Sequence, residues 1–290
     1  MIQGYIAGEG DAWEWTLAFL HRAVDDMTRS AASADEALAQ YDGFAQRLGQ
    51  RLGEMHRILA QDTDHEAFIP GVAGKDQLAR WRQRIGGRIA AAFDGLRDRL
   101  DTLDENDRSL ADGILARGDA LKAAVARLIQ DGAGAPLHRI HGDFHLGQVL
   151  VASGDAVIID FEGEPAQPLA ERRAKDSGWR DVAGILRSLD YVLMARLRGG
   201  VASKEGFEAL DAAFRTRIPS TLLDAYRAAA GTQAEGPEAA RDAALLDLFL
   251  IEKAAYEVVY EVGNRPDWLG VPLGGLARLV DGLLGAEPRQ

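Results

Sequence analysis

The stretch that decides the fold is residues 141–162, which read HGDFHLGQVLVASGDAVIIDFE. Two short apolar segments flank a turn at residues 154–155, a pattern typical of a β-hairpin. Asp143 and Gln148 precede the first apolar segment, and Asp160 directly follows the second. One hairpin would therefore bring all three polar side chains to one edge, with Asp160 held at the end of a rigid strand.

Asp143, Gln148 and Asp160 are the candidate chemical groups of this stretch. Phosphoryl transfer needs a group that orients and deprotonates the attacking hydroxyl, and oxygen ligands for Mg²⁺. Asp143 fits the first role as the catalytic residue, and Gln148 and Asp160 fit the second. Asp143 and Gln148 have the spacing of Asp and Asn in the protein-kinase catalytic loop, and Asp160 stands where kinases have the Asp of D-F-G. The structural alternative is a plain hairpin with Asp160 capping its exit.

With these residues the chain resembles the maltokinases, relatives of the aminoglycoside phosphotransferases and of eukaryotic-like kinases. The central match is residues 141–148 followed by residues 159–165. Further similar segments lie at residues 8–14, 171–173, 180–188, 252–257 and 264–268. The resemblance implies a bilobal, ATP- and Mg²⁺-dependent kinase that converts maltose to maltose 1-phosphate. Trehalose synthase, to which some maltokinases are fused, is an implied partner.

In the maltokinases an N-lobe, with a phosphate-covering loop and a strand lysine, precedes the segment that begins here at residue 8. Lys75 and Lys122 are the lysines before the catalytic loop, and both lie in helical or loop context. Residues 71–76 lack the G-x-x-x-x-G-K-[ST] spacing and a preceding strand. We therefore expect residues 1–290 to form a kinase-like C-lobe without its N-lobe, and leave the nucleotide-binding residues unassigned.

Four neighbouring residues have supporting roles under this interpretation. His141 is expected to bond backbone near the metal-binding strand, and Asp181 to anchor the catalytic loop, or to cap a helix. His145 is a candidate contact for phosphate or sugar, with a loop-stabilising hydrogen bond as the alternative. Glu162 replaces the glycine of D-F-G. It is a candidate ligand of a second metal or of the sugar, or the partner of a nearby arginine.

A polar and aromatic stripe marks the candidate acceptor site. Lys253, Tyr256, Glu257 and Tyr260 recur at three- and four-residue steps, and Trp268 follows. Sugar sites combine aromatic faces with groups that bond hydroxyls, and the resemblance implies the sugar here. The alternative is a buried salt-bridge network.

The amino-acid composition limits which binding partners and metal sites the chain can have. The net charge of −12 argues against nucleic acid or an anionic membrane surface, and the absence of cysteine excludes disulfides and thiolate zinc sites. The sequence shows no apolar run long enough to span a membrane and no signal peptide, so cytoplasmic location is the default expectation.

Hydrophobic periodicity predicts a mainly α chain with one small β-hairpin, an aminoglycoside-phosphotransferase-like C-lobe. We expect helical residues 1–135, a catalytic hairpin in 136–165 and a helical acceptor-binding part in 166–290. Capping boxes at Asp11 and Ser33 start the first two helices. The second of these helices is expected to end near Leu59. Further helices are expected over residues 76–103, 107–130, 180–198, 203–230, 238–262 and 273–284, and strands only in 137–160.

Three functions remain open at this point. The leading one is a maltokinase-like sugar kinase. The second is a kinase for another sugar such as an amino sugar, which an added carboxylate in the acceptor groove would favour and Lys253 mildly opposes. The third is a non-catalytic sugar-binding module or truncated kinase, which the missing N-lobe would favour.

Overall fold

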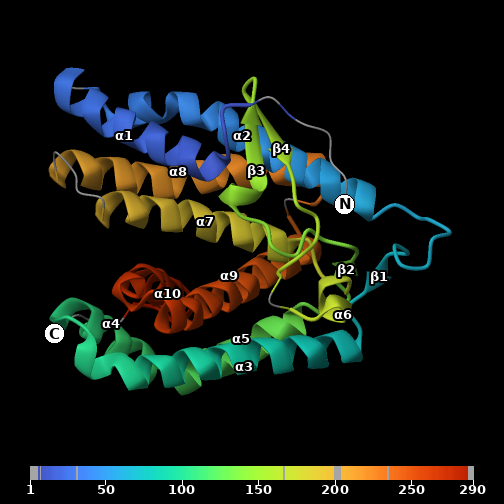
Figure 1. Ribbon diagram of the computed structural model, residues 1–290. Helices are drawn as coiled ribbons and strands as arrows, with labels where there is room; N and C mark the ends of the chain where they lie inside the picture. The colour runs from blue at the N-terminus through green and yellow to red at the C-terminus, as the bar shows by residue number, and fades with distance from the viewer. Residues whose placement is uncertain are drawn as a thin grey trace. The chain divides into compact units, whose positions relative to one another are not determined.

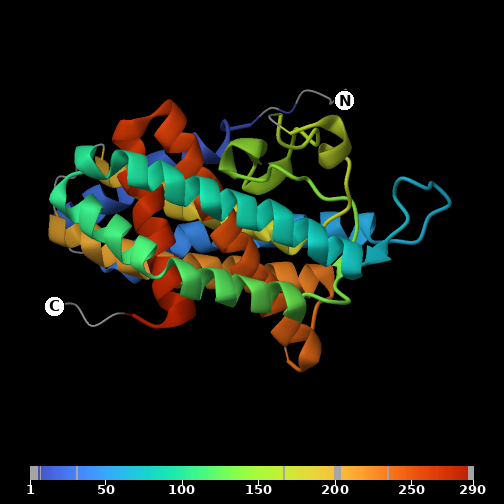
Figure 2. The same cartoon turned by 90° about the horizontal axis from the view of Figure 1, so that it is seen from below.

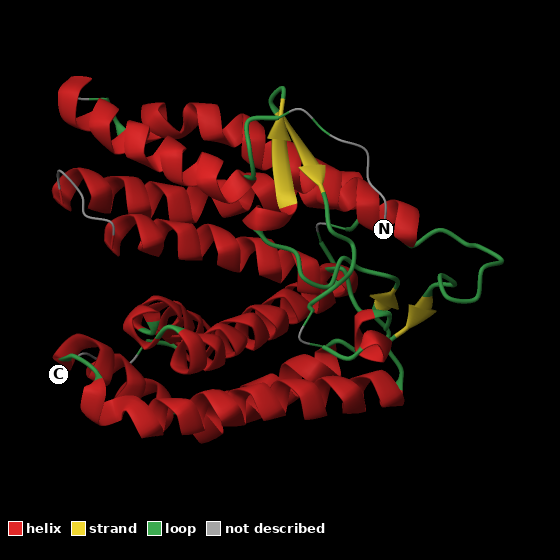
Figure 3. Cartoon of the chain, viewed as in Figure 1, coloured by secondary structure: helices red, strands yellow, loops and turns green. Residues whose placement is uncertain are grey.

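The computed structural model describes residues 6, 8–30, 32–165, 167–198, 204–233 and 235–286. These residues are mostly helical, with two small two-stranded antiparallel sheets (Figure 3). They divide into two compact units, each built from two separate stretches of chain. The first unit is Met1–Pro70 with His138–Gly236, and the second is Gly71–Leu137 with Pro237–Gln290. No helix among the described residues is long and apolar enough to cross a bilayer.

The first unit combines four long helices with the hairpin. Its helices and strands are α1 (Ala12–Ser30), α2 (Ala34–Leu59), the 3₁₀ turn η2 (Leu146–Gln148), β3 (Val149–Ala152), β4 (Asp155–Ile158), α6 (Leu169–Arg172), α7 (Trp179–Arg198) and α8 (Lys204–Ala230). Figure 1 shows α1, α2, α7 and α8 running side by side, with the hairpin against α2. α2 begins with the expected capping box, in which Ser33 and Glu36 bond each other's backbone N–H groups. The expected start of α8 at residue 203 lies outside the described residues.

Two glycines let α2 approach α8 at backbone distance. A Cβ on Gly49 would lie 2.2 Å from the carbonyl oxygen of Leu222, and one on Gly53 would lie 2.6 Å from that of Tyr226. Any other residue at these positions would push the two helices apart. His56 is three residues beyond Gly53, on the next turn of α2, so this contact also brings its ring to Tyr226.

The hairpin has the expected strands but a different turn. Ala152 pairs with Asp155, so Ser153 and Gly154 are the two turn residues, with φ of 52° and 75°. Two left-handed residues are the signature of the tight turn whose twist matches antiparallel strands. Asp155 therefore belongs to β4, and its carboxylate accepts bonds from the Arg51 guanidinium at 2.6 and 3.1 Å, which tie the hairpin to α2.

The second unit consists mainly of long helices, the teal, green and red ribbons of Figure 2. Its helices and strands are β1 (Gly71–Val72), α3 (Lys75–Arg99), the 3₁₀ turn η1 (Leu100–Thr102), α4 (Glu105–Ala116), α5 (Gly118–Asp131), β2 (Pro136–Leu137), α9 (Pro237–Asn264), the 3₁₀ turn η3 (Pro266–Trp268) and α10 (Gly270–Leu284). α9 contacts α3, α5 and α10. Trp81 of α3 is fully buried against Phe249 of α9 with the rings edge to face, 5.7 Å between centroids.

Two expectations for this unit were wrong. The helix expected over residues 107–130 is broken at Arg117 into α4 and α5. Gly118 lies so close to Phe93 that a Cβ there would be 2.7 Å from the ring, and Arg117 bonds Asp281 at 2.5 Å. These tertiary contacts override the continuous helical pattern. A strand also forms outside residues 137–160, because β1 pairs with β2.

Candidate active site

Asp181 holds the start of the loop that carries Asp143. Its two carboxylate oxygens accept the backbone N–H groups of His141 and Gly142 at 2.7 and 2.9 Å. Gly142 has a φ of 84°, a left-handed conformation that glycine adopts at little cost. The loop therefore turns at Gly142 directly after its anchor, and Asp143 follows the turn.

The pKa of Asp181 reports how strongly its charge is stabilised. Burial, with the residue only 1% exposed, would raise that pKa. The hydrogen bond and electrostatic interaction with His56, the interaction with His141 and the N–H of Gly142 outweigh burial, so the pKa of Asp181 lies below its usual value. The anchor is therefore a buried carboxylate that these contacts keep ionised.

One face of α7 holds the rest of the loop. Gly184, three residues after Asp181, lies where a Cβ would be 2.4 Å from the carbonyl oxygen of Phe144. Ser188, four residues further, accepts the N–H of Leu146 at 3.1 Å through its hydroxyl. Residues at i, i+3 and i+7 lie on one side of a helix, so α7 contacts the loop at three points.

His141 links the loop to the end of the hairpin. Its Nε2 donates to the carbonyl oxygen of Ile159 at 2.8 Å, and its ring lies 5.3 Å from that of Phe161. Asp160, between them, has a φ of 60°, which turns the chain out of β4. The backbone N–H of Ile159 also donates to the carbonyl oxygen of Gln148 at 3.0 Å.

The two expected metal ligands contact each other. The Gln148 side-chain nitrogen lies 3.3 Å from Oδ2 of Asp160. Among the described residues no cluster of three His, Cys, Asp or Glu side chains could hold a metal. One carboxylate with one amide nevertheless fits Mg²⁺, which takes one or two protein carboxylates and completes its shell with phosphate oxygens and water.

His145 and Glu162 border this edge. Nδ1 of His145 accepts the N–H of Gly147 at 3.1 Å, the loop-stabilising contact that was one of its two expected roles. Arg172 donates to the backbone carbonyl of Glu162 at 3.2 Å. Glu162 itself is exposed, two residues after Asp160.

Behind the anchor lies a buried pair that the sequence analysis missed. Nε2 of His56 is 3.1 Å from Oδ2 of Asp181, and Nδ1 of His56 is 3.0 Å from the hydroxyl of Tyr226. His56 and Tyr226 are 2% and 3% exposed. The sequence signal that could have pointed to this pair is His56 itself, a histidine on the apolar stripe of α2, one turn after Gly53.

The expected acceptor stripe lies in the second unit, on α9 and η3. The Lys253 ammonium is 4.9 Å from the centroid of the Tyr256 ring, and the Arg88 guanidinium is 5.2 Å from it. Tyr260 and Trp268 both contact a third cation, Arg265, at 5.6 and 5.3 Å. The aromatic rings of the stripe are thus already in cation–π contact.

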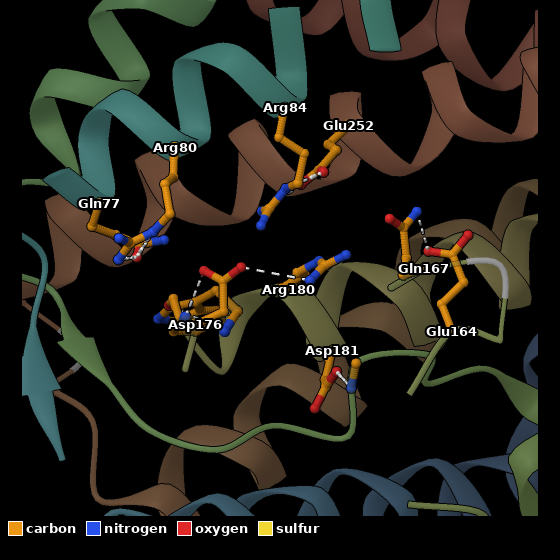
Figure 4. Close-up of polar contacts among 12 residues, drawn as sticks. Gln77, Arg80, Arg84, Glu164, Gln167, Asp176, Arg180, Asp181 and Glu252 are labelled. Atoms are coloured by element: carbon orange, nitrogen blue, oxygen red, sulfur yellow. Dashed lines mark hydrogen bonds and ion pairs between the residues drawn. The ribbon is translucent and has the colours of Figure 1, made fainter. Parts of the chain in front are cut away.

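Buried carboxylates alternate with these aromatic residues. Glu252 is held by Arg84 at 2.7 Å (Figure 4) and by Arg88 at 2.9 Å, and Glu261 is paired with Arg265. Glu257, between them in sequence, is 9% exposed. The second unit therefore contains an ion-pair network, which was the alternative to a sugar site, although its carboxylates are Glu252 and Glu261. Arg84 and Arg88 were not anticipated.

Comparisons with known proteins agree with the kinase-like loop. The family model described as "Phosphotransferase enzyme family" matches residues 5–163. A glucosamine kinase of Streptacidiphilus jiangxiensis is 30% identical over 283 residues, covering 93% of this chain and 55% of the relative. One from Mycolicibacterium smegmatis is 27% identical over 286 residues, covering 97% of this chain and 62% of the relative. The chain thus spans about 55–62% of the length of these relatives.

A solved structure, "Glucosamine kinase in complex with glucosamine, ADP and inorganic phosphate", matches with a TM-score of 0.72 and 26% identity, over 97% of this chain and 63% of that one. These relatives are named glucosamine kinases, so the expected resemblance holds at the level of the kinase-like superfamily and its maltokinase detail is not supported. The matched segment contains the loop, the hairpin and Asp160, and on this evidence the chain belongs to the phosphotransferase enzyme family.

Proposed function

We propose that this chain is part of an ATP- and Mg²⁺-dependent sugar kinase whose acceptor is an amino sugar of the glucosamine class. The observation that carries the proposal is the anchored loop, in which Asp181 fixes the turn before Asp143 while Gln148 and Asp160 meet at 3.3 Å. The glucosamine kinases among the relatives support the choice of acceptor over maltose.

Each loop residue has a role in this proposal. Asp143 accepts the proton of the attacking sugar hydroxyl and keeps that oxygen in line with the γ-phosphate. Gln148 and Asp160 hold Mg²⁺, which when bound offsets the charge on the phosphate oxygens. His141 fixes the distance between loop and hairpin, because it bonds the carbonyl next to Asp160. His145 and Glu162, at the same edge, are the proposed contacts of phosphate or sugar.

The amino group of the acceptor needs a carboxylate. Arginines pair with Glu252 and Glu261 on α9. Glu257 is the carboxylate of the expected acceptor stripe, and on that ground we propose it as the contact of the ammonium group. Lys253, which seemed to oppose an amino sugar, lies over the Tyr256 ring, an arrangement in which its charge is balanced by the ring rather than directed at the substrate. Tyr256, Tyr260 and Trp268 remain the proposed surfaces for the sugar C–H groups.

The test compares sugars that differ in one group. Glucosamine, N-acetylglucosamine, glucose and maltose are titrated into the purified chain in a calorimeter, and each is offered with MgATP in an ADP-release assay. We expect glucosamine to bind best and to be the best acceptor, because the other sugars lack the ammonium group and with it a charge-assisted hydrogen bond to a carboxylate. A preference for maltose or for the acetylated sugar would contradict the proposal.

A matched pair of variants locates the amino-sugar contact. Glu257→Gln removes the charge but keeps the shape, and we expect it to weaken glucosamine more than glucose, by about tenfold or more. Glu238→Gln, at the exposed start of α9, makes the same change away from the stripe and serves as the control. Equal weakening of both sugars in Glu257→Gln would assign this glutamate to the ion-pair network instead.

A further inference from the structure

The buried contact between α2 and α8 reaches the catalytic loop through one histidine. The contacts run from the Tyr226 hydroxyl to Nδ1 of His56 at 3.0 Å, and from Nε2 of His56 to Oδ2 of Asp181 at 3.1 Å. The same oxygen of Asp181 accepts the N–H of His141 at 2.7 Å. This chain of contacts, the Tyr226–His56–Asp181 relay, ends on the loop backbone two residues before Asp143.

The directions of these hydrogen bonds follow from what each group can donate. Asp181 is ionised and accepts at both oxygens, so the His56 nitrogen that faces it must carry a hydrogen. A neutral imidazole then has a lone pair on its other nitrogen, which needs a donor. The Tyr226 hydroxyl is that donor. In the other tautomer the lone pair of Nε2 would face a carboxylate, which is repulsive.

Packing keeps the His56 ring in this orientation. A Cβ on Gly178 would lie 2.6 Å from Nδ1 of His56 and 3.1 Å from the Tyr226 hydroxyl, so only glycine fits beside the pair. The rings of His56 and Tyr226 meet edge to face at 5.6 Å, and the rings of Trp179 and Tyr226 also meet edge to face, at 5.2 Å. The His138 ring is 5.1 Å from that of His56.

We propose that Tyr226 is a positioning residue of the catalytic loop, because its hydroxyl donates to Nδ1 of His56 and so holds the ring in the orientation and tautomer that direct Nε2–H at Asp181. Tyr226 touches no reacting group in this scheme. It acts through His56 on the carboxylate that holds the turn before Asp143. Only the kinetic consequence of this inference rests on the proposed function, since the tautomer and the order of the loop can be measured without turnover.

The test uses two tyrosine-to-phenylalanine variants in the same unit. Tyr226→Phe removes the hydroxyl and leaves the ring packing in place. Tyr41→Phe is the matched control, because Tyr41 is fully buried and its hydroxyl bonds only Thr16 among the contacts seen, at 2.8 Å, away from the loop. Both variants lose one buried neutral hydrogen bond and should lose similar stability.

The tautomer is read from ¹⁵N spectra of histidine-labelled protein, which has six histidines to assign. In the wild type we expect His56 to carry its hydrogen on Nε2, with Nδ1 as an acceptor. A hydrogen on Nδ1 in the wild type would overturn the proposal, whatever the variants do. In Tyr226→Phe we expect the ¹⁵N resonance of His56 Nδ1 to shift. In Tyr41→Phe we expect the same resonance to remain unchanged.

Loop order is read from amide hydrogen exchange at His141 and Gly142. We expect both amides to exchange about tenfold faster in Tyr226→Phe than in Tyr41→Phe, because weakening their acceptor opens the loop locally. Equal exchange in the two variants would mean that Tyr226 contributes only to overall stability, and the proposal would be wrong.

Turnover then distinguishes this inference from the proposed function. In an active protein we expect Tyr226→Phe to lower kcat about threefold to tenfold with the KM for the sugar unchanged, and Tyr41→Phe to leave both unchanged. Faster exchange with unchanged kcat would refute the positioning role. If the wild type neither binds nor phosphorylates any of the sugars, the proposed function fails, and the tautomer and exchange results decide this inference alone.

Discussion

Replacing Asp181 by asparagine tests whether this carboxylate anchors the loop. The change keeps the shape of the side chain but converts one of its two oxygens to an NH₂ group. That group must face either the N–H of Gly142, or the N–H of His141 together with Nε2–H of His56. In either orientation a donor meets a donor inside the protein.

The expected cost follows from these contacts. Asp181→Asn loses one or two hydrogen bonds to a charged acceptor, each worth about 1.5–3 kcal/mol. It also removes the desolvation cost of a residue that is 1% exposed, so we take the lower part of the range, about 2–4 kcal/mol. For a unit of this size each kcal/mol lowers Tm by about 2–4 °C.

Urea unfolding followed by circular dichroism measures this loss, and ADP release measures its effect on transfer. Asp155→Asn is the control, because it makes the same chemical change in the same unit at a carboxylate that is 37% exposed and paired with Arg51. An exposed pair contributes about 0–1 kcal/mol. If Asp181→Asn is no more destabilising than Asp155→Asn, the loop does not depend on its anchor.

Three further predictions concern the site and its surroundings. Asp143→Asn should lower turnover by about 10²–10⁴-fold in a folded active protein, and undiminished turnover would remove Asp143 from the mechanism. Asp160→Ala should weaken Mg²⁺-dependent nucleotide binding more than Gln148→Ala, because a carboxylate brings charge to a hard cation; a Mg²⁺ titration that gives the opposite order would centre the metal elsewhere. Burial, and then the electrostatic interaction with His56, hold the pKa of His138 below its ordinary 6.5. As the pH falls, His138 therefore gains its proton in the unfolded chain before it does so in the folded one. Its contribution to the free energy of unfolding should be fully present above about pH 6.5 and should decrease as the pH falls further, by at most about 1.4 kcal/mol per pH unit. His138→Gln should show a flatter urea-midpoint profile between pH 7.5 and 5.5, and an unchanged profile would contradict the assignment.

The parts of the fold set by local sequence could be predicted. The capping box at Ser33 predicted the start of α2, and the apolar stripe that follows it predicted where the helix ends. Both signals depend on residues only a few positions apart in the sequence. The loop and hairpin were equally accessible, because Gln148 and Asp160 are only twelve residues apart and a tight turn connects them. Their roles in transfer remain proposals.

Most of the missed features depend on residues far apart in the chain. The break at Arg117 comes from Phe93 and Asp281, and neither contact leaves a trace in the pattern of residues 107–130. The same holds for Glu252, whose partners Arg84 and Arg88 lie on another helix. A sequence pattern reports which side of a helix is apolar, but not which arginine will meet a buried carboxylate.

The close contact of α2 with α8 also has a consequence for synthesis. His56 and Tyr226 are separated by 170 residues, so at about 5–20 residues per second the ribosome needs about 10–30 s to deliver the second after the first. During this interval the glycine face of α2, with Gly49 and Gly53, has no partner helix, while the whole of residues 71–137 emerges and can begin to fold. Slow codons or a bound chaperone before residue 226 would lengthen that exposure, and a nascent chain stalled there would display the complete loop motif without the tyrosine that orients its anchor.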